Sequence, residues 1–183
     1  MSTPRLLVKY RKEVIPAMLE EFKYPNVMAV PKISKVVVNV GYGKPALAKE
    51  TKAIEKMLQA IAKITGQRPA TRKAKQSISG FKLRQGLAIG AVVTLRGRRM
   101  YDFIDRLIAV ALPRSRDFRG LERRSFDREG NLNIGIKEHN IFPEVTYESL
   151  KDIFGLEITV VTTARSQAEG MTLLRLMGFP IKT

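Results

Sequence analysis

A long basic stretch in the middle of the chain is the part of the sequence best suited to a chemical task. Between Lys56 and Tyr101 there are eleven Lys and Arg residues and no Asp or Glu. A segment without acidic residues cannot neutralise itself through internal ion pairs, so its positive potential is left for phosphate groups. Its centre, at about residues 72–86, predicts a protruding basic loop. An ordinary solvated loop is the alternative, although such a surface normally mixes both signs of charge.

The composition of the whole chain gives the same indication. Its 183 residues include 33 Lys and Arg against 17 Asp and Glu, for a formal net charge of +16. Nucleic acid or an anionic membrane is the expected partner of such a chain. At 44% hydrophobic residues the chain can also bury a core, so a folded domain is expected. A second basic segment spans residues 114–128 and contains Arg114, Arg116, Arg119, Arg123, Arg124 and Arg128.

Apolar periodicity predicts the elements that must position these segments. Residues that alternate between apolar and small or polar types indicate strands at 33–40, 87–96, 132–137 and 156–163. Helical spacing indicates helices at 4–22, 47–65 and 100–112, and after a Ser166 cap. Pro16 should interrupt the first of them, Pro113 should end the third, and Gly178 should end the last.

These elements predict an α+β fold with a mostly antiparallel sheet, helices packed on one face and long basic loops. No linker divides the chain, so a single domain over residues 1–183 is expected. The open face of the sheet would carry short polar and basic groups that suit phosphates and riboses. An ordinary solvated sheet face is the alternative. The residues expected on this face are Lys35, Asn39, Thr94, Arg96, Asn133 and Lys137.

Enzymatic function has little support in the sequence. The pattern Gly41-x-Gly43-x-x-Ala46 after a strand imitates a dinucleotide-binding fingerprint, so an NADP-binding oxidoreductase domain using Arg72 is the alternative. The acidic ribose ligand of that fingerprint is missing. His139 is the only histidine and the chain has no Cys, which excludes disulfides, thiolate zinc sites and histidine clusters. We therefore expect no enzyme, metal or cofactor, and a reducing compartment such as the cytoplasm.

The basic charge favours RNA over a membrane or DNA. The longest aliphatic run, Leu107 to Leu112, is too short to span a bilayer, and no signal peptide is evident. The basic clusters fall in loops, whereas membrane-surface binding needs a basic amphipathic helix. No helix-turn-helix or zinc finger for DNA is visible, so folded RNA is the better partner.

Several motifs, in order, closely resemble the bacterial ribosomal large-subunit protein five family, and the similarity covers essentially the whole chain. The motifs are the segments Tyr10–Phe22, Lys32–Gly43, Thr65–Pro69, Lys73–Gly86, Val93–Gly97, Asp117–Leu121 and Ile141–Pro143. The resemblance implies a structural protein of the cytoplasmic ribosome that binds 5S rRNA and attaches it to large-subunit rRNA in the central protuberance. Asn39, Gln67 and Thr94 match positions associated with the 5S rRNA contact, and Lys35 and Arg96 would add phosphate contacts.

The resemblance also implies further partners. The basic loop would reach the elbow of the peptidyl-site tRNA through Arg72, Lys73, Lys75, Gln76, Ser77, Lys82 and Arg84. Regions at about 112–119 and 133–144 resemble those that face small-subunit protein thirteen across an intersubunit bridge, next to neighbouring large-subunit proteins. The candidate bridge residues are Arg114, Arg116, Asp117, Glu138 and Glu144.

Overall fold

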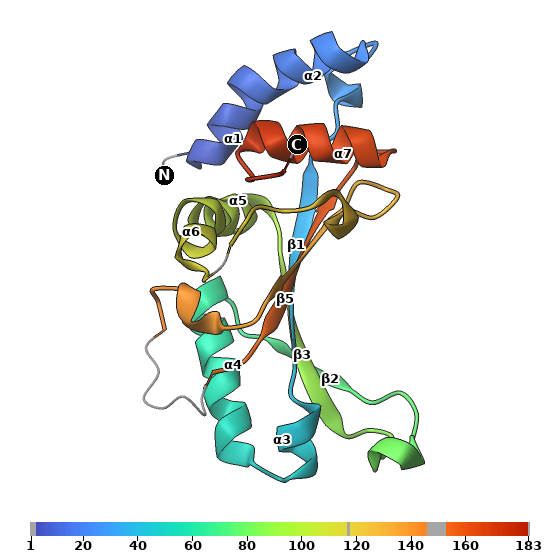
Figure 1. Ribbon diagram of the computed structural model, residues 1–183, viewed down its shortest axis with the longest axis vertical. Helices are drawn as coiled ribbons and strands as arrows, with labels where there is room; N and C mark the ends of the chain where they lie inside the picture. The colour runs from blue at the N-terminus through green and yellow to red at the C-terminus, as the bar shows by residue number, and fades with distance from the viewer. Residues whose placement is uncertain (1–2, 117, 146–152, 183) are drawn as a thin grey trace. The chain divides into compact units, whose positions relative to one another are not determined.

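The strands of the protein form a five-stranded antiparallel sheet in the order β2-β3-β1-β5-β4 (Figure 1). The computed structural model describes residues 3–116, 118–145 and 153–182. Helices occur before, between and after the strands without a regular β-α-β alternation, so the predicted α+β class is confirmed. The strands are β1 (Ile33–Gly41), β2 (Ala70–Lys73), β3 (Ala88–Leu95), β4 (Leu132–Ile136) and β5 (Leu156–Thr162).

The chain divides into two compact units. The first unit comprises Met1–Val36, Leu95–Ile134 and Thr159–Thr183, and the second comprises Val37–Thr94 and Gly135–Ile158. Strands β1, β3, β4 and β5 each contribute residues to both units, whereas β2 belongs to the second unit alone. The single domain expected over residues 1–183 remains a prediction.

Alternation along the strands confirms that the sheet has one buried face and one open face. Successive side chains of a strand point to opposite faces, so every second residue shares an environment. The non-buried alternate positions include Val37 and Asn39 on β1 and Asn133 and Gly135 on β4. The buried alternate positions are Val36, Val38, Val40, Ala91, Val93, Leu95, Leu132, Ile134, Ile136, Leu156, Ile158, Val160 and Thr162, while Ile33 and Gly90 are buried outside this alternation.

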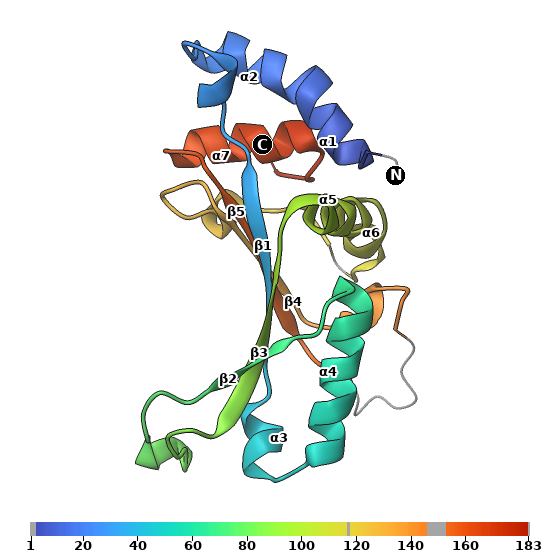
Figure 2. The same ribbon diagram turned by 180° about the vertical axis from the view of Figure 1, so that it is seen from behind.

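Two helices belong to the second unit. Helix α3 spans Gly43–Leu47 and α4 spans Thr51–Thr65, and α4 runs alongside the strands of this unit (Figures 1 and 2). Its buried residues include Ile61 and Ile64. The expectation of one helix starting at residue 47 was wrong at its beginning, because Lys49 has a left-handed backbone (φ 59°) that separates the two helices.

The first unit contains two helical segments that are interrupted in the same way. Helix α1 (Arg5–Lys9) continues through a π turn, Tyr10–Val14, into α2 (Ile15–Phe22). Likewise α5 (Gly97–Arg106) continues through the π turn Leu107–Ala111 into α6 (Leu112–Arg114). Short 3-10 turns occur at Val27–Ala29, Ser79–Phe81, Arg123–Ser125 and His139–Ile141.

Each π turn is followed, after one intervening residue, by a proline. Pro16 and Pro113 occupy the first turn of α2 and of α6. At this position the missing N–H of proline is tolerated because it coincides with a break in the α-helical hydrogen-bond ladder. The interruption expected at Pro16 is therefore confirmed, and the helix expected to stop at Pro113 ends one residue later, at Arg114.

Helix α7 (Gln167–Met177) begins and ends as the sequence predicts. The Ser166 hydroxyl accepts a hydrogen bond from the Glu169 backbone N–H at 3.3 Å, and the Glu169 carboxylate accepts one from the Arg165 backbone N–H at 2.9 Å. This is reciprocal capping of the first turn. Gly178 ends the helix with φ 105°, a conformation that favours glycine.

The stability of the first unit should fall at alkaline pH because of the buried phenol of Tyr10. The Tyr10 hydroxyl donates a hydrogen bond to the Pro31 carbonyl at 3.0 Å. Burial, with a contribution from neighbouring Tyr101, raises the pKa of Tyr10 to about 12. An unfolded tyrosine ionises at about pH 10, so the contribution is fully present below about pH 10 and is lost as the pH rises toward about 12.

Chemical denaturation of wild type and Tyr10→Phe across this pH range tests the assignment. The fall in unfolding free energy should be shallower in the variant, by at most about 1.4 kcal/mol per pH unit. Identical profiles for the two proteins would contradict a role for Tyr10.

Candidate nucleic-acid interface

Asn39 and Thr94 lie on the open face of the second unit, as predicted. Asn39 is exposed between buried Val38 and Val40 on β1, and Thr94 is half-buried between Val93 and Leu95 on β3. β1 and β3 are neighbours in the sheet, so the two polar side chains share a face of adjacent strands. In the part of the chain that the structure describes, neither side chain has a hydrogen-bond partner.

Gln67 joins this pair because of the way α4 ends. Gly66 ends the helix with φ 67°. The buried Thr65 hydroxyl donates to the Ile61 carbonyl at 2.7 Å and accepts from the Gln67 backbone N–H at 3.4 Å. The Gln67 side-chain amide then reaches the Thr94 carbonyl, with Nε2 at 3.5 Å from the oxygen. The three residues predicted together from the resemblance, Asn39, Gln67 and Thr94, thus lie in one unit, with Gln67 in contact with the Thr94 backbone and Asn39 on the neighbouring strand.

The two basic residues predicted with them lie in the first unit. Lys35 is half-buried on β1, and Arg96 is exposed directly before α5. Lys35 thus occupies a non-buried position on a strand, whereas Arg96 lies outside the strands, and their contacts with phosphate remain a prediction.

The basic segment forms an ordered hairpin in which Arg72 and Lys73 belong to a strand. β2 pairs antiparallel with β3, with Ala70 opposite Val92 and Arg72 opposite Gly90. This strand was missed in the sequence because all four of its residues are exposed. An exposed strand has no alternation of apolar and polar residues for a pattern to detect.

Backbone hydrogen bonds continue from β2 to the tip of the hairpin, which extends away from α4 (Figure 1). Ala74 exchanges bonds of 2.8 and 3.0 Å with Leu87 and Gly86, and Ile78 and Leu83 exchange two bonds of 3.0 and 3.1 Å. The Ser77 hydroxyl accepts from the Gln85 backbone N–H at 2.9 Å, which gives this predicted contact residue a structural task. The other predicted contact residues beyond β2 are exposed: Lys75, Gln76, Lys82 and Arg84.

The tip of the hairpin exposes an aromatic ring that is not among the predicted contact residues. Phe81 is 71% exposed and Ile78 is 47% exposed. Phe81 lies in the Ser79–Phe81 turn directly before Lys82. An exposed ring beside cations can stack on a nucleobase while the cations hold the phosphates. The sequence feature that could have indicated this ring is a single aromatic residue within a basic stretch that has no acidic residues.

The predicted bridge residues are divided between the two units. Arg114 and Arg116 are exposed in the first unit, and Asp117 lies outside the described residues. Glu138 and Glu144 are half-buried in the second unit, where the Glu138 carboxylate accepts a hydrogen bond from the Asn140 amide at 2.9 Å.

His139 has a structural environment. It is 2% exposed, and its ring stacks on Phe154 with centroids 4.1 Å apart. Its backbone N–H donates to the Phe154 carbonyl at 3.1 Å, and its Nδ1 accepts from the Phe154 N–H at 3.3 Å. The ring therefore joins two segments of the second unit and lies away from solvent.

The oxidoreductase alternative lacks the geometry it needs. A dinucleotide fingerprint requires a parallel β-α-β unit, whereas this sheet is antiparallel and Gly43 begins the five-residue helix α3. Among the described residues, no three acidic or histidine side chains converge as a metal site. None of the helices that the structure describes is long and apolar enough to cross a membrane.

Comparison with known proteins identifies the class as ribosomal. Residues 26–84 match the model for ribosomal protein L5, and residues 88–181 match the model for the C-terminus of the same ribosomal family. Relatives named large ribosomal subunit protein uL5 are similar over nearly their full length. The relative from Citrifermentans bemidjiense is 50% identical over 97% of this chain and 98% of its own. That from Chloroflexus aurantiacus is 49% identical over 98% of this chain and 99% of its own.

The chain belongs to the ribosomal protein L5 family. This confirms the predicted family and the prediction of a structural, non-enzymatic protein of the large ribosomal subunit in the cytoplasm.

Proposed function

We propose that this protein binds 5S rRNA through the open face of its second unit and helps to attach it to large-subunit rRNA in the central protuberance. The observation that carries the proposal is the grouping of Asn39, Gln67 and Thr94. Amide and hydroxyl groups can both donate to and accept from riboses and base edges, which suits specific RNA contacts. The net charge of +16 supplies affinity for the phosphates around them.

The same proposal assigns the basic hairpin to the peptidyl-site tRNA. Its exposed Lys and Arg side chains grip a phosphate backbone without reading its sequence, which suits an RNA that changes in every cycle. Phe81 adds a platform for an unpaired base. The segments that carry Arg114 and Arg116, and Glu138 and Glu144, are proposed to face small-subunit protein thirteen across the intersubunit bridge.

Replacing Asn39 with aspartate should lower the affinity for 5S rRNA at least about fivefold, since one well-placed polar contact to a base is worth about 1–3 kcal/mol. The change conserves shape but adds a negative charge to an exposed position of the RNA-facing side. Filter binding of the purified protein to 5S rRNA, with tRNA and an unrelated duplex as competitors, measures the loss.

Asn133→Asp is the matched control for this variant. It makes the same change on the open face of β4, where the side-chain oxygen already accepts a hydrogen bond from Thr159 at 2.8 Å. Equal losses for Asn39→Asp and Asn133→Asp would mean that net charge alone determines binding. If about six phosphates are neutralised, log K for wild type should fall with log salt at a slope of roughly −4 to −5. A slope near zero would contradict the electrostatic part of the proposal.

A further inference from the structure

We infer that the first unit carries a second RNA-binding surface, formed by the arginine pair Arg123 and Arg124 on the turn Arg123–Ser125. The inference rests on the proposed function for the class of partner and goes beyond the residues assigned there. The pair belongs to the first unit, whereas Asn39, Gln67 and Thr94 belong to the second. The proposed ligand of this surface is the phosphate backbone of RNA.

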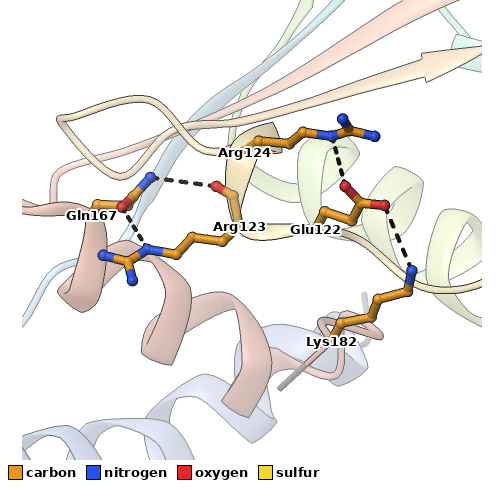
Figure 3. Close-up of polar contacts among 5 residues, drawn as sticks. All are labelled: Glu122, Arg123, Arg124, Gln167 and Lys182. Carbon is orange, nitrogen blue, oxygen red and sulfur yellow. Dashed lines mark hydrogen bonds and ion pairs between the residues drawn. The ribbon is translucent and has the colours of Figure 1, made fainter.

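Gln167 fixes the first arginine of the pair. The Arg123 Nε donates to the Gln167 Oε1 at 3.1 Å, and the Gln167 Nε2 donates back to the Arg123 carbonyl at 3.3 Å (Figure 3). The same Nε2 also donates to the Phe126 carbonyl at 3.1 Å. One neutral side chain from α7 thus holds both the turn and the guanidinium group, and its contact with the guanidinium group is at Nε.

Glu122 orients the second arginine. The Arg124 Nε lies 2.6 Å from one Glu122 carboxylate oxygen, and the Lys182 Nζ lies 3.6 Å from the other (Figure 3). The Arg124 side chain is nevertheless 84% exposed. An exposed ion pair adds little stability, so its main effect here is to orient the guanidinium group. Both arginines are therefore held at Nε, and their terminal nitrogens are available to a ligand.

The backbone that carries the pair is anchored to the C-terminal part of the chain. The Leu121 N–H donates to the Pro180 carbonyl at 2.8 Å, and the Lys182 N–H donates to the Leu121 carbonyl at 2.9 Å. On the other side of the pair, Gly130 lies directly against Gly170 of α7. A surface anchored on both sides loses less conformational entropy on binding than a mobile loop does.

The acidic groups near this surface oppose its positive charge but are outnumbered, since Glu122, Asp127 and Glu129 lie in the segment that carries Arg119, Arg123, Arg124 and Arg128. The Asp127 carboxylate accepts hydrogen bonds from the Glu129 and Asn131 N–H groups at 3.0 and 2.8 Å and from the Asn131 amide at 2.7 Å. Glu122 is shared between Arg124 and Lys182. Arg119 and Arg128, in the same segment, are exposed and extend the positive field.

The chemistry of the surface favours an RNA backbone over a protein or a membrane. Two terminal guanidinium nitrogens match the spacing of two phosphate oxygens and can bind them together. Protein interfaces need an apolar core and membrane surfaces need an apolar face. The large exposed apolar side chains found among the described residues lie in other segments, at Val27, Met28, Leu47, Ile78 and Phe81.

The test is the salt dependence of binding of the full chain to a blunt-ended RNA duplex without loops. The double variant Arg123→Gln/Arg124→Gln should weaken binding at low salt at least about tenfold. It should also reduce the slope of log K against log salt by about 2, or about 1 for each phosphate that is no longer neutralised. Arg123→Lys/Arg124→Lys, which keeps the charge but loses the planar fork, should retain the slope and bind with intermediate affinity.

The charge-matched control is Arg99→Gln/Arg175→Gln. Both of these arginines are exposed on helices of the first unit, in the first turn of α5 and the last turn of α7. Equal losses for the two double glutamine variants would overturn the inference, because net charge would then explain the binding. The inference would also be overturned if Arg123→Gln/Arg124→Gln lost binding to polyglutamate but bound duplex RNA as wild type does. That result would indicate an acidic protein partner.

Thermal melting of each variant checks that the protein is folded. Binding of 5S rRNA by Asn39→Asp, measured in parallel, separates the two proposals. If Asn39→Asp binds 5S rRNA normally while the arginine double variant loses duplex binding, the proposed sheet-face site is wrong and the inference about the arginine pair is supported.

Discussion

Gly170→Ala should destabilise the protein by at least about 3 kcal/mol, at the upper end of the range for overpacking a buried site. A Cβ at residue 170 would lie 2.5 Å from the Gly130 Cα and 2.7 Å from its carbonyl carbon, and closer still to the carbonyl oxygen. All three are backbone atoms, so no flexible side chain can yield. Helix propensity alone gives the opposite sign, because alanine is favoured over glycine inside a helix by about 1 kcal/mol. A fall in stability would therefore show that the contact with Gly130 outweighs helix propensity, and a rise would show the reverse.

Thermal unfolding measures this effect. In a chain of this size the melting temperature falls by about 2–4 °C for each kcal/mol lost, so Gly170→Ala should lower it by roughly 6–12 °C. Gly135→Ala is the matched control. Residue 135 is exposed on β4, and a Cβ there would meet nothing within 4 Å. A melting temperature for Gly170→Ala at or above that of wild type would show that the two backbones can separate without loss. Because the Gly130 contact helps to hold the arginine pair against α7, Gly170→Ala should also weaken duplex RNA binding.

Removing four charges from the basic hairpin should abolish most tRNA binding and leave selective 5S rRNA binding largely intact. The variant replaces Lys73, Lys75, Lys82 and Arg84 with glutamine. All four side chains are exposed, and the hairpin backbone is held by its own hydrogen bonds, so the fold should persist. The slope of log K against log salt for tRNA should fall in magnitude by about 3, since each phosphate that is no longer neutralised removes about 0.7–0.9.

The matched control for the hairpin replaces Lys44, Lys49, Lys52 and Lys63 with glutamine. These lysines are also exposed in the second unit, so the two variants have the same net charge. Competition filter binding with 5S rRNA and tRNA at several salt concentrations measures both. Equal weakening of 5S rRNA and tRNA binding by the hairpin variant would refute the division of labour between the sheet face and the hairpin.

The strands and the open sheet face could be predicted from the sequence because they depend on local periodicity. Val36, Val38 and Val40 are buried and Asn39 is exposed, as their alternation indicates. The Ser166 cap and the Gly178 end of α7 were likewise predictable from residue types and spacing. Local chemistry is sufficient in such cases because each residue's partner lies within a few positions along the chain.

Other parts depend on contacts between distant residues or on exposure. The Arg123–Gln167 contact joins residues 44 positions apart, and the sequence gives no sign of it. The Gly130–Gly170 contact is similar, since a glycine inside a helical pattern can mean a weak helix as well as a close approach. The order of the hairpin and the exposure of Phe81 were missed because polar, basic residues suggest a mobile loop. The RNA partners of all these surfaces remain predictions.

The two π turns leave a periodicity that can be read from sequence alone. The buried residues Leu6, Tyr10, Val14 and Met18 are spaced four apart, as are Phe103, Leu107 and Ala111. In a regular α-helix a step of four residues exceeds one turn by about 40°, so three such steps would carry a side chain roughly 120° around the helix. A wider π turn restores the alignment and keeps these residues on one side. Buried apolar residues that repeat every four positions therefore indicate a helix that contains a π turn.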